Sequence, residues 1–281
     1  MTNERIQAEK LELGVAEHCN LACRSCSHVS PVIPKRNMDP LTLLEDLTIL
    51  SRVYHAHVVS LIGGEPLLHP NLVDIFDAIR QSEVGDRIAV ATNGVLLPRM
   101  KPEFWQAVDW VEVSQYPGHS LTPDQQGVCY RSAAESGTGI RFVSRREFRQ
   151  AYSEPGTQDS ALSQAIFDSC GIVHVWRCHT LAAGRFFKCP QSYYLSHIIP
   201  DVARHVTTDS VLIRDTPSFA EELRAYLDST IPLGACGHCL GTAGRRFPHS
   251  QVSRRGFREL QMLTAEELVD PELLAKGLPV G

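Results

Sequence analysis

The sequence lacks a membrane-spanning segment, a secretory leader and an excess of basic residues. Its 281 residues contain no apolar run of about 18 residues, the length that a transmembrane helix needs. The first residues, from Met1 to Arg5, are polar, so we expect no signal peptide. Lysine and arginine number 27 against 32 acidic residues, a net charge of −5, which argues against nonspecific nucleic-acid binding. We therefore expect a cytoplasmic protein that binds neither membranes nor nucleic acid.

The sequence also lacks a dinucleotide-binding signature. No G-x-G-x-x-G motif follows the first expected strand, which argues against a Rossmann fold. What is present is an alternation of strands and helices, which predicts parallel βαβ units. Apolar, β-branched runs predict strands over 11–16, 58–62, 87–91, 110–114 and 140–143. Helices are expected over 40–54, 70–82, 102–108 and 122–135. Too few residues precede the later cysteines for the eight units of a complete barrel.

Nine cysteines are present, and in a reducing compartment they favour metal ligation over disulfides. The first three, Cys19, Cys23 and Cys26, have the spacing C-x3-C-x2-C. Three thiolates on one loop can hold three irons of a [4Fe–4S] cluster and leave the fourth iron open to a small molecule. A zinc site completed by His18 or His28 is the alternative.

This spacing after a short strand resembles the signature of the radical SAM (S-adenosylmethionine) superfamily. In that family the open iron chelates SAM, and one electron cleaves SAM to a 5′-deoxyadenosyl radical that abstracts hydrogen from a substrate. The resemblance implies a [4Fe–4S] cluster with one open iron, SAM, and a flavodoxin or ferredoxin-type electron donor. It also implies an α/β fold, a partial (β/α) barrel of about five or six parallel strands. Many members carry an aromatic residue where this chain has Ser25.

Later motifs extend the resemblance into the expected SAM site. Gly63-Gly64-Glu65-Pro66 looks like the family's GGE motif, in which glycines admit the backbone and a carboxylate complements the amino group of SAM. Thr92-Asn93-Gly94 is similar to the polar exit of the third strand. Arg141 would reach the SAM carboxylate, although it and Ser114 could instead be barrel residues with satisfied hydrogen bonds. The resemblance assigns cofactor contacts to Gly63, Gly64, Glu65, Thr92, Asn93, Ser114 and Arg141.

Five further cysteines gather in the last third of the chain. A β-hairpin turning near Ala183-Gly184 is expected there, and a C-x2-C pair follows. The pattern resembles the SPASM and twitch extensions of radical SAM enzymes and implies one auxiliary [4Fe–4S] cluster. Its expected ligands are Cys189, Cys236 and Cys239, with either Cys170 or Cys178 as the fourth. Family spacing favours Cys170 and hairpin proximity favours Cys178; a structural zinc ribbon is the alternative to a cluster.

The expected organisation is a radical SAM core over 1–168, an auxiliary-cluster subdomain over 169–245 and a tail over 246–281 with a helix near 264–274. Cys129 stands apart within the fourth expected helix. It is either a buried apolar residue or a thiol that donates hydrogen to a substrate radical, as in radical epimerases.

The expected reaction is dehydrogenation or epimerisation at a C–H centre of a small polar metabolite in natural-product biosynthesis. The substrate would be a sugar, aminocyclitol or nucleoside. Similar twitch enzymes include the 2-deoxy-scyllo-inosamine dehydrogenase, whose auxiliary cluster is thought to accept the electron left after hydrogen abstraction. Maturation of a ribosomal peptide is the first alternative, and a non-catalytic iron–sulfur or zinc protein is the second.

Overall fold

The computed structural model describes residues 4–259 and 262–278, and these fall into two units. The first unit takes its residues from Met1–Asn20 and Lys35–Arg146, and the second from Leu21–Pro34 and Glu147–Gly281. Residues 147–168, expected with the core, are therefore grouped with the second unit. Within the described ranges, no helix has the length and apolar character needed to cross a membrane.

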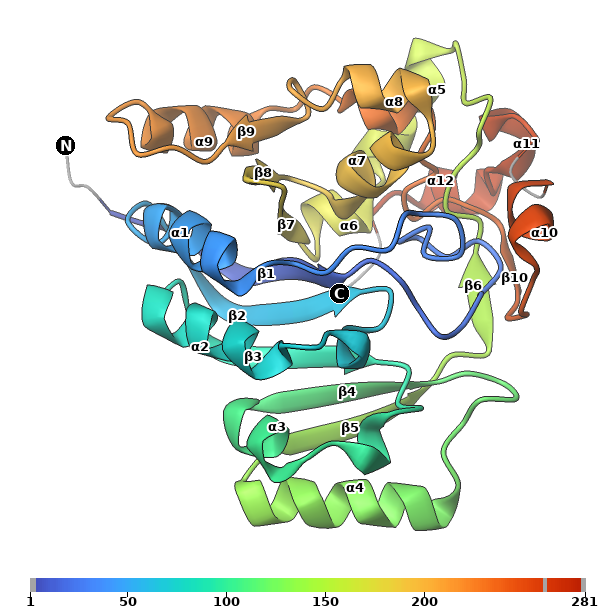
Figure 1. Ribbon diagram of the computed structural model, residues 1–281. Helices are drawn as coiled ribbons and strands as arrows, with labels where there is room; N and C mark the ends of the chain where they lie inside the picture. Colours follow the sequence, from blue (N-terminus) through green and yellow to red (C-terminus); the bar gives the residue numbers. More distant parts are fainter. Residues whose placement is uncertain (1–3, 260–261, 279–281) are drawn as a thin grey trace. The chain divides into compact units, whose positions relative to one another are not determined.

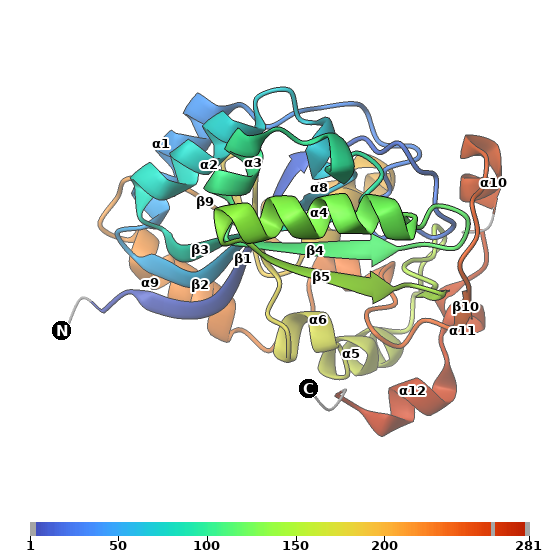
Figure 2. The same cartoon turned by 90° about the horizontal axis from the view of Figure 1, so that it is seen from below.

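The first unit is a parallel sheet with helices on one of its faces (Figures 1 and 2). Its strands have the spatial order β5-β4-β3-β2-β1, and every neighbouring pair is parallel. The strands are β1 (Ile6–Ala16), β2 (Tyr54–Gly63), β3 (Gly85–Thr92), β4 (Trp110–Gln115) and β5 (Gly139–Ser144). The helices are α1 (Pro40–Leu50), η1 (Pro66–Leu68), α2 (Leu72–Ser82), η2 (Leu97–Arg99), α3 (Pro102–Ala107) and α4 (Pro123–Ser136). The expected α/β class is confirmed.

Local sequence explains where the helices begin and end. Thr122 and Gln125 form a capping box at the start of α4, and Gly137 ends that helix with φ +72°. The helix expected over 40–54 stops at Leu50, because the buried Tyr54 pairs with Ile6 as the first residue of β2.

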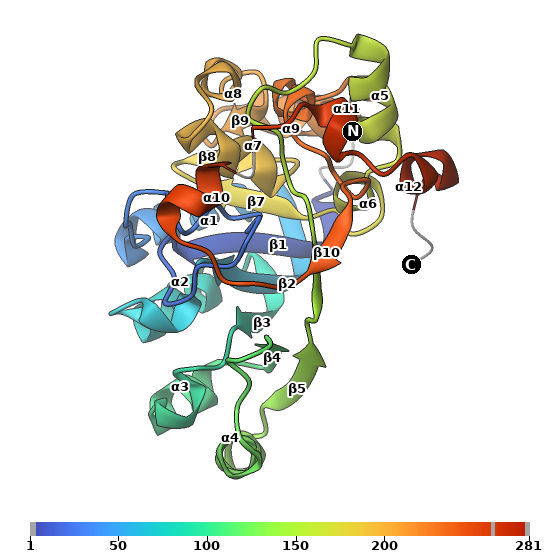
Figure 3. The same cartoon turned by 90° about the vertical axis from the view of Figure 1, so that its right-hand side faces the viewer.

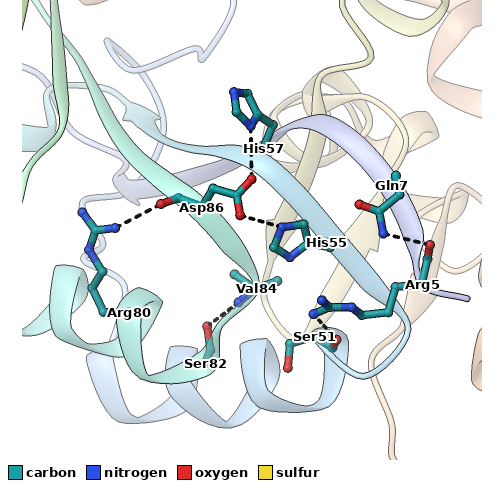
Figure 4. A network of polar contacts seen from close by, with 9 residues as sticks. All are labelled: Arg5, Gln7, Ser51, His55, His57, Arg80, Ser82, Val84 and Asp86. Atoms are coloured by element: carbon teal, nitrogen blue, oxygen red, sulfur yellow. Dashed lines mark hydrogen bonds and ion pairs between the residues drawn. The ribbon is translucent and has the colours of Figure 1, made fainter.

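A polar network ties the amino-terminal ends of β2 and β3 (Figure 4). Asp86 pairs with His55 at 2.9 Å and with His57 at 3.1 Å, since alternate residues of a strand point to the same side. Arg80 adds a bond from its guanidinium to the carbonyl of Asp86 at 3.2 Å. These contacts thus join β2 and β3 at one end, and the glycine-rich motifs lie at the other end of the strands.

The second unit contains short helices and two small antiparallel pairings. Strands β7 (His179–Ala182), β8 (Arg185–Phe187) and β9 (Ser210–Leu212) form one, and β6 (Glu147–Arg149) pairs with β10 (Arg246–Pro248) in the other (Figure 3). The turn residues Ala183 and Gly184 have φ of +50° and +70°, so the expected hairpin is confirmed. The remaining elements are α5 (Ser160–Asp168), α6 (Gly171–His174), α7 (Pro190–Tyr194), η3 (Leu195–His197), α8 (Pro200–Arg204), α9 (Phe219–Asp228), η4 (Gly234–Gly237), α10 (Arg254–Glu259), α11 (Ala265–Leu268) and α12 (Pro271–Lys276).

The core of the second unit includes part of the loop that carries the first cysteines. Val29 and Ile33 are buried in one cluster with Tyr152, Tyr194 and Phe257. A segment near the amino terminus is therefore anchored by residues more than a hundred positions later in the chain.

The prediction of a single tail helix over 264–274 is wrong. Two short helices occupy this stretch instead, α11 and α12. Asp270 caps the second helix and Pro271 begins it, and a proline cannot continue a helix that started before it.

Candidate functional site

The GGE segment interlocks with the end of β1 through backbone bonds. The Gly64 N–H donates to the Ala16 carbonyl at 2.7 Å, and the Glu65 N–H donates to the His18 carbonyl at 3.0 Å. A Cβ added at Gly64 would lie 2.2 Å from the His18 oxygen, and one at Gly63 would lie 2.6 Å from the Ala16 oxygen. These contacts require glycine, because any side chain would displace the backbone that leads into Cys19.

Glu65 connects the GGE segment to the polar residues at the carboxyl end of β3. Its carboxylate is wholly buried and accepts bonds from the Thr92 hydroxyl at 2.6 Å, the Asn93 N–H at 2.8 Å and the Leu67 N–H at 3.1 Å. Burial raises the pKa of Glu65, although these three bonds act in the opposite direction. The structure thus brings together Glu65, Thr92 and Asn93, three of the residues that the sequence singled out.

Asn93 extends this network to the first cysteine. Its side-chain amide donates to the Asn20 carbonyl oxygen at 2.6 Å and to the Cys19 sulfur at 3.6 Å. Its own carbonyl oxygen accepts from the Val95 N–H at 3.0 Å, which fixes the orientation of the amide. Sequence reasoning missed Asn20, whose position next to a cysteine carries no signal of its own.

The carboxyl edge of the sheet also holds polar atoms that lack protein partners. Gln115 Nε2 and His18 Nδ1 are buried and form no hydrogen bond within the described part of the chain. Gln115 follows Ser114 at the end of β4, and its oxygen accepts from the Leu121 N–H at 3.0 Å. Buried polar groups are almost always paired, so these atoms suit a polar ligand at the edge where α/β proteins bind ligands.

Arg141 is engaged in an ion pair on the sheet. It lies beside Glu112 in the register of β4 and β5 and pairs with that carboxylate, which also accepts from Arg145 at 2.7 Å. Burial acts to raise the pKa of Glu112, but the two arginines outweigh it and hold the pKa below its ordinary value. Ser114 is half-buried on the same strand.

Cys23 and Cys26 lie in the part of the loop that belongs to the second unit. The backbone amides of His28, Val29 and Ser30 bond to the Cys26 sulfur, and burial raises the pKa of this thiol despite them. Amides directed at sulfur are the surroundings that iron–sulfur clusters use. His28 lies edge-on to Tyr194, and its burial lowers its pKa to about 4.

At Ser25 the sequence departs from the pattern of the family that it resembles, and the structure shows what this residue contacts. Ser25 is buried with φ +52°, and its hydroxyl accepts from the Ala151 N–H at 3.0 Å. A small polar side chain thus joins the cysteine loop to the irregular segment that follows β6, where an aromatic ring could not make the same bond.

Four of the later cysteines line one apolar pocket in the second unit. Burial and mutual repulsion among these thiols raise the pKa values of Cys189, Cys236 and Cys239. Among the described residues, no three His, Cys, Asp or Glu side chains converge as a single metal ion requires. The lining residues are Ile166, Phe167, Cys170, Val173, Cys189, Gln191, Ser192, Leu233, Ala235, Cys236, Cys239 and Gly241. A set of soft thiols that would repel one another as bare thiolates fits an iron–sulfur cluster.

Cys178 does not line this pocket, whereas Cys170 does. The Cys178 N–H donates to the Ile172 carbonyl at 3.0 Å, and β7 begins only at His179. The preceding residue, Arg177, has φ +45°, which breaks the extended backbone that would place Cys178 opposite Cys189.

A buried carboxylate holds the loop that carries the C-x2-C pair. Asp209 accepts from the Gly234 N–H at 2.7 Å and from the Ala235 N–H at 2.8 Å. His238, inside the pair, instead bonds through Nδ1 to the Glu154 carbonyl at 3.1 Å. Sequence reasoning missed Asp209, and no local pattern could have indicated it, because it lies 26 residues from Ala235.

Cys129 is wholly buried on α4, a helix that packs against α3, β5 and η2. Burial raises the pKa of its thiol to about 11. In this position it contributes to the helix–sheet core and has no exposed surface to offer a substrate.

Comparison with known proteins finds similarity to one family over part of the chain. Residues 14–115 match the model described as "Radical SAM superfamily". Molybdenum cofactor biosynthesis protein 1 of Bos taurus is 35% identical over 102 residues, covering 34% of this chain and 16% of that protein. The GTP 3′,8-cyclase of Microcystis aeruginosa is 31% identical over 105 residues, covering 36% of this chain and 32% of that protein. The matched part therefore spans a third or less of these relatives.

Among solved structures, BtrN in complex with AdoMet and 2-DOIA aligns with a TM-score of 0.48 at 17% identity, over 85% of this chain and 96% of that chain. The matched segment of this chain contains Cys19, Cys23 and Cys26 together with the GGE and TNG elements. Residues 14–115 are therefore similar to the radical SAM superfamily, as the resemblance in the sequence predicts.

Proposed function

We propose that this chain is a radical SAM dehydrogenase that acts on a small polar metabolite and carries an auxiliary [4Fe–4S] cluster. The observation that supports this most strongly is the pocket bordered by Cys170, Cys189, Cys236 and Cys239, in addition to the loop of Cys19, Cys23 and Cys26. When bound, the first cluster and SAM supply hydrogen abstraction from a C–H bond, and the second cluster supplies an acceptor for the electron that remains.

The residues of the chain bind and orient these groups. The GGE and TNG elements form one hydrogen-bonded network through Glu65, which holds the glycine backbone close to the start of the cysteine loop. Gln115 and His18 present unpaired polar atoms to the edge where SAM would lie. The polar ends of parallel strands are where α/β folds bind small molecules.

The second cysteine set is suited to hold a cluster away from water. Ile166, Phe167 and Leu233 line the pocket together with the four thiols. An apolar shell around a cluster lowers solvent access and thereby sets its redox properties. Cys170 is the fourth ligand in this proposal, since it borders the pocket and Cys178 does not.

The substrate class follows from the reaction proposed and from the names of the relatives. A dehydrogenation needs a carbon that bears both hydrogen and an oxidisable group, as a sugar or aminocyclitol carbinol does. Some relatives that match the first part of the chain are called GTP 3′,8-cyclases, so a nucleotide is included as a test substrate.

Iron counting with paired cysteine variants tests the proposal. Anaerobically reconstituted protein is expected to hold about eight irons per chain, as two four-iron clusters do. Cys170→Ser is expected to lose about half of this iron, whereas Cys178→Ser, the matched control, keeps all of it. Equal iron in both variants would remove Cys170 from the ligand set, and stoichiometric zinc without iron would refute the function as a whole.

A substrate panel of carbinol sugars, aminocyclitols and GTP, each deuterated at candidate carbons, tests the reaction. Dehydrogenation moves deuterium into 5′-deoxyadenosine and yields an oxidised product with no hydrogen taken from solvent. Solvent deuterium in an otherwise unchanged product would instead establish epimerisation. Turnover only with a peptide would establish maturation of a ribosomal peptide.

A further inference from the structure

The chain beyond β10 returns to the cysteine loop and runs antiparallel to it. Residues 249–252 lie against residues 22–24, all within the second unit, and Cys23 forms a bridge pair with Gln251. Two backbone bonds join the segments at 2.8 Å each, from the Arg24 N–H to the Ser250 carbonyl and from the Val252 N–H to the Ala22 carbonyl. Cys23 is therefore held in a short ladder instead of an unsupported loop.

Two side chains of the returning segment contact the Cys23 sulfur at hydrogen-bond distance. His249 Nε2 is 3.2 Å from Sγ, and Gln251 Nε2 is 3.4 Å from it. Alternate residues of an extended strand share a side, which explains why residues 249 and 251 both reach one atom. Cys23 is only 8% exposed, so these contacts form away from bulk water.

The hydrogen-bonding pattern identifies both side chains as donors. Gln251 Oε1 accepts from the Ala22 N–H at 2.6 Å, so the amide nitrogen of Gln251 is the atom that faces sulfur. An iron-bound thiolate has no proton to give, and His249 must therefore carry its proton on Nε2 to bond to it. The His249 ring is held edge-on to Phe148 at a centroid distance of 4.8 Å.

We propose that His249 and Gln251 are positioning residues that raise the reduction potential of the cluster bound through Cys23. This inference rests on the proposed function. A hydrogen bond to a ligating thiolate withdraws charge from the sulfur and stabilises the more negative, reduced cluster. The donors of Cys26 are mostly backbone amides, with the Ser30 hydroxyl in addition, whereas the two side-chain donors of Cys23 can be changed one at a time by mutagenesis.

Redox titration of the reconstituted protein, followed by EPR, tests the proposal. The signal of the N-terminal cluster is identified as the one that shifts when SAM is added. His249→Leu removes one donor, and Gln251→Glu replaces the other while keeping the oxygen that accepts from Ala22. Ser250→Ala is the control, because the exposed Ser250 serves the ladder through its backbone carbonyl.

Each donor variant is expected to lower the ratio of reduced to oxidised cluster at a fixed potential about tenfold, equivalent to about 59 mV for one electron. His249→Gln, which keeps an N–H donor, is expected to recover most of this shift, and Ser250→Ala to show none. Both donor variants titrating within threefold of the unmodified protein would overturn the proposal. Loss of iron from both, with Ser250→Ala intact, would also overturn it, since the residues would then hold the cluster without setting its potential. If the unmodified protein bound no iron at Cys19, Cys23 and Cys26, the proposed function itself would fail.

Discussion

Replacing Gly64 by alanine is expected to damage the N-terminal cysteine loop while leaving the rest of the fold intact. The added Cβ would lie 2.2 Å from the His18 carbonyl oxygen and 3.0 Å from the Cys19 nitrogen. Both are backbone atoms, so no side-chain rotation relieves the overlap. The backbone between β1 and Cys19 must move, and with it the carbonyl that accepts from Glu65.

The magnitude follows from two opposing effects. Overpacking of this kind costs about 1–3 kcal/mol. Restriction of the unfolded chain returns about 0.4–1 kcal/mol on changing glycine to alanine at a compatible backbone conformation. A net loss of about 1–2 kcal/mol lowers the melting temperature by about 2–8 °C for a chain of this size.

The matched control is Gly127→Ala in α4. A Cβ there meets only the flexible end of Arg131 at 3.6 Å, and alanine stabilises a helix interior by about 1 kcal/mol relative to glycine. Scanning calorimetry and iron analysis of both variants separate the two effects. We expect Gly64→Ala to melt lower and lose about four irons, and Gly127→Ala to melt higher and keep them all. A Gly64→Ala protein that matched Gly127→Ala in both measurements would refute the reasoning.

Three further outcomes are expected. Asp209→Ala removes two bonds to the loop of Cys236, each worth about 1.5–3 kcal/mol, and should release auxiliary iron selectively; iron analysis showing equal loss from both clusters would contradict this. His57 and His55 lower the pKa of Asp86, so the stability that this carboxylate contributes is present above its unfolded pKa of about 3.9 and lost as pH falls through the lower native value. Urea unfolding should accordingly show a shallower acid limb for Asp86→Asn than for the unmodified protein, and identical limbs would exclude this role. Cys129→Ala should leave product formation and its isotope content unchanged, because the thiol is wholly buried; loss of solvent-derived hydrogen from the product would assign it the donor role after all.

The parts of the fold that sequence predicts well are those with strong local signals. The five parallel strands were indicated by apolar runs, and α4 by its threonine cap and its terminal glycine. Boundaries depended on partners that sequence does not display, as Tyr54 shows by joining β2 instead of ending α1. The sequence indicates the hairpin turn at Ala183-Gly184. The extended backbone before it is interrupted at Arg177, however, so the regular hairpin that would place Cys178 opposite Cys189 does not form.

The candidate site divides in the same way. The N-terminal cysteines and the GGE and TNG elements can be recognised in the sequence, because the residues of each motif lie close together in the chain. Asp209, His249 and Gln251 act on atoms far away in the chain, and the last two lie 226 and 228 residues from Cys23. A single histidine or glutamine at such a separation has no periodicity or spacing that identifies it. Arg141 illustrates the converse case, because its pairing with Glu112 depends on a strand register that only the structure supplies.

The return of residues 249–252 to the cysteine loop also sets an order of events during synthesis. Cys23 leaves the ribosome early, while Gln251 follows 228 residues later, which at about 5–20 residues per second is a delay of roughly 10–45 s. The nascent loop spends this interval without its ladder and without the two donors to its sulfur. Iron inserted before the chain is finished would meet a more open loop than iron inserted afterwards, so maturation of this protein is expected to favour the completed chain over the nascent one.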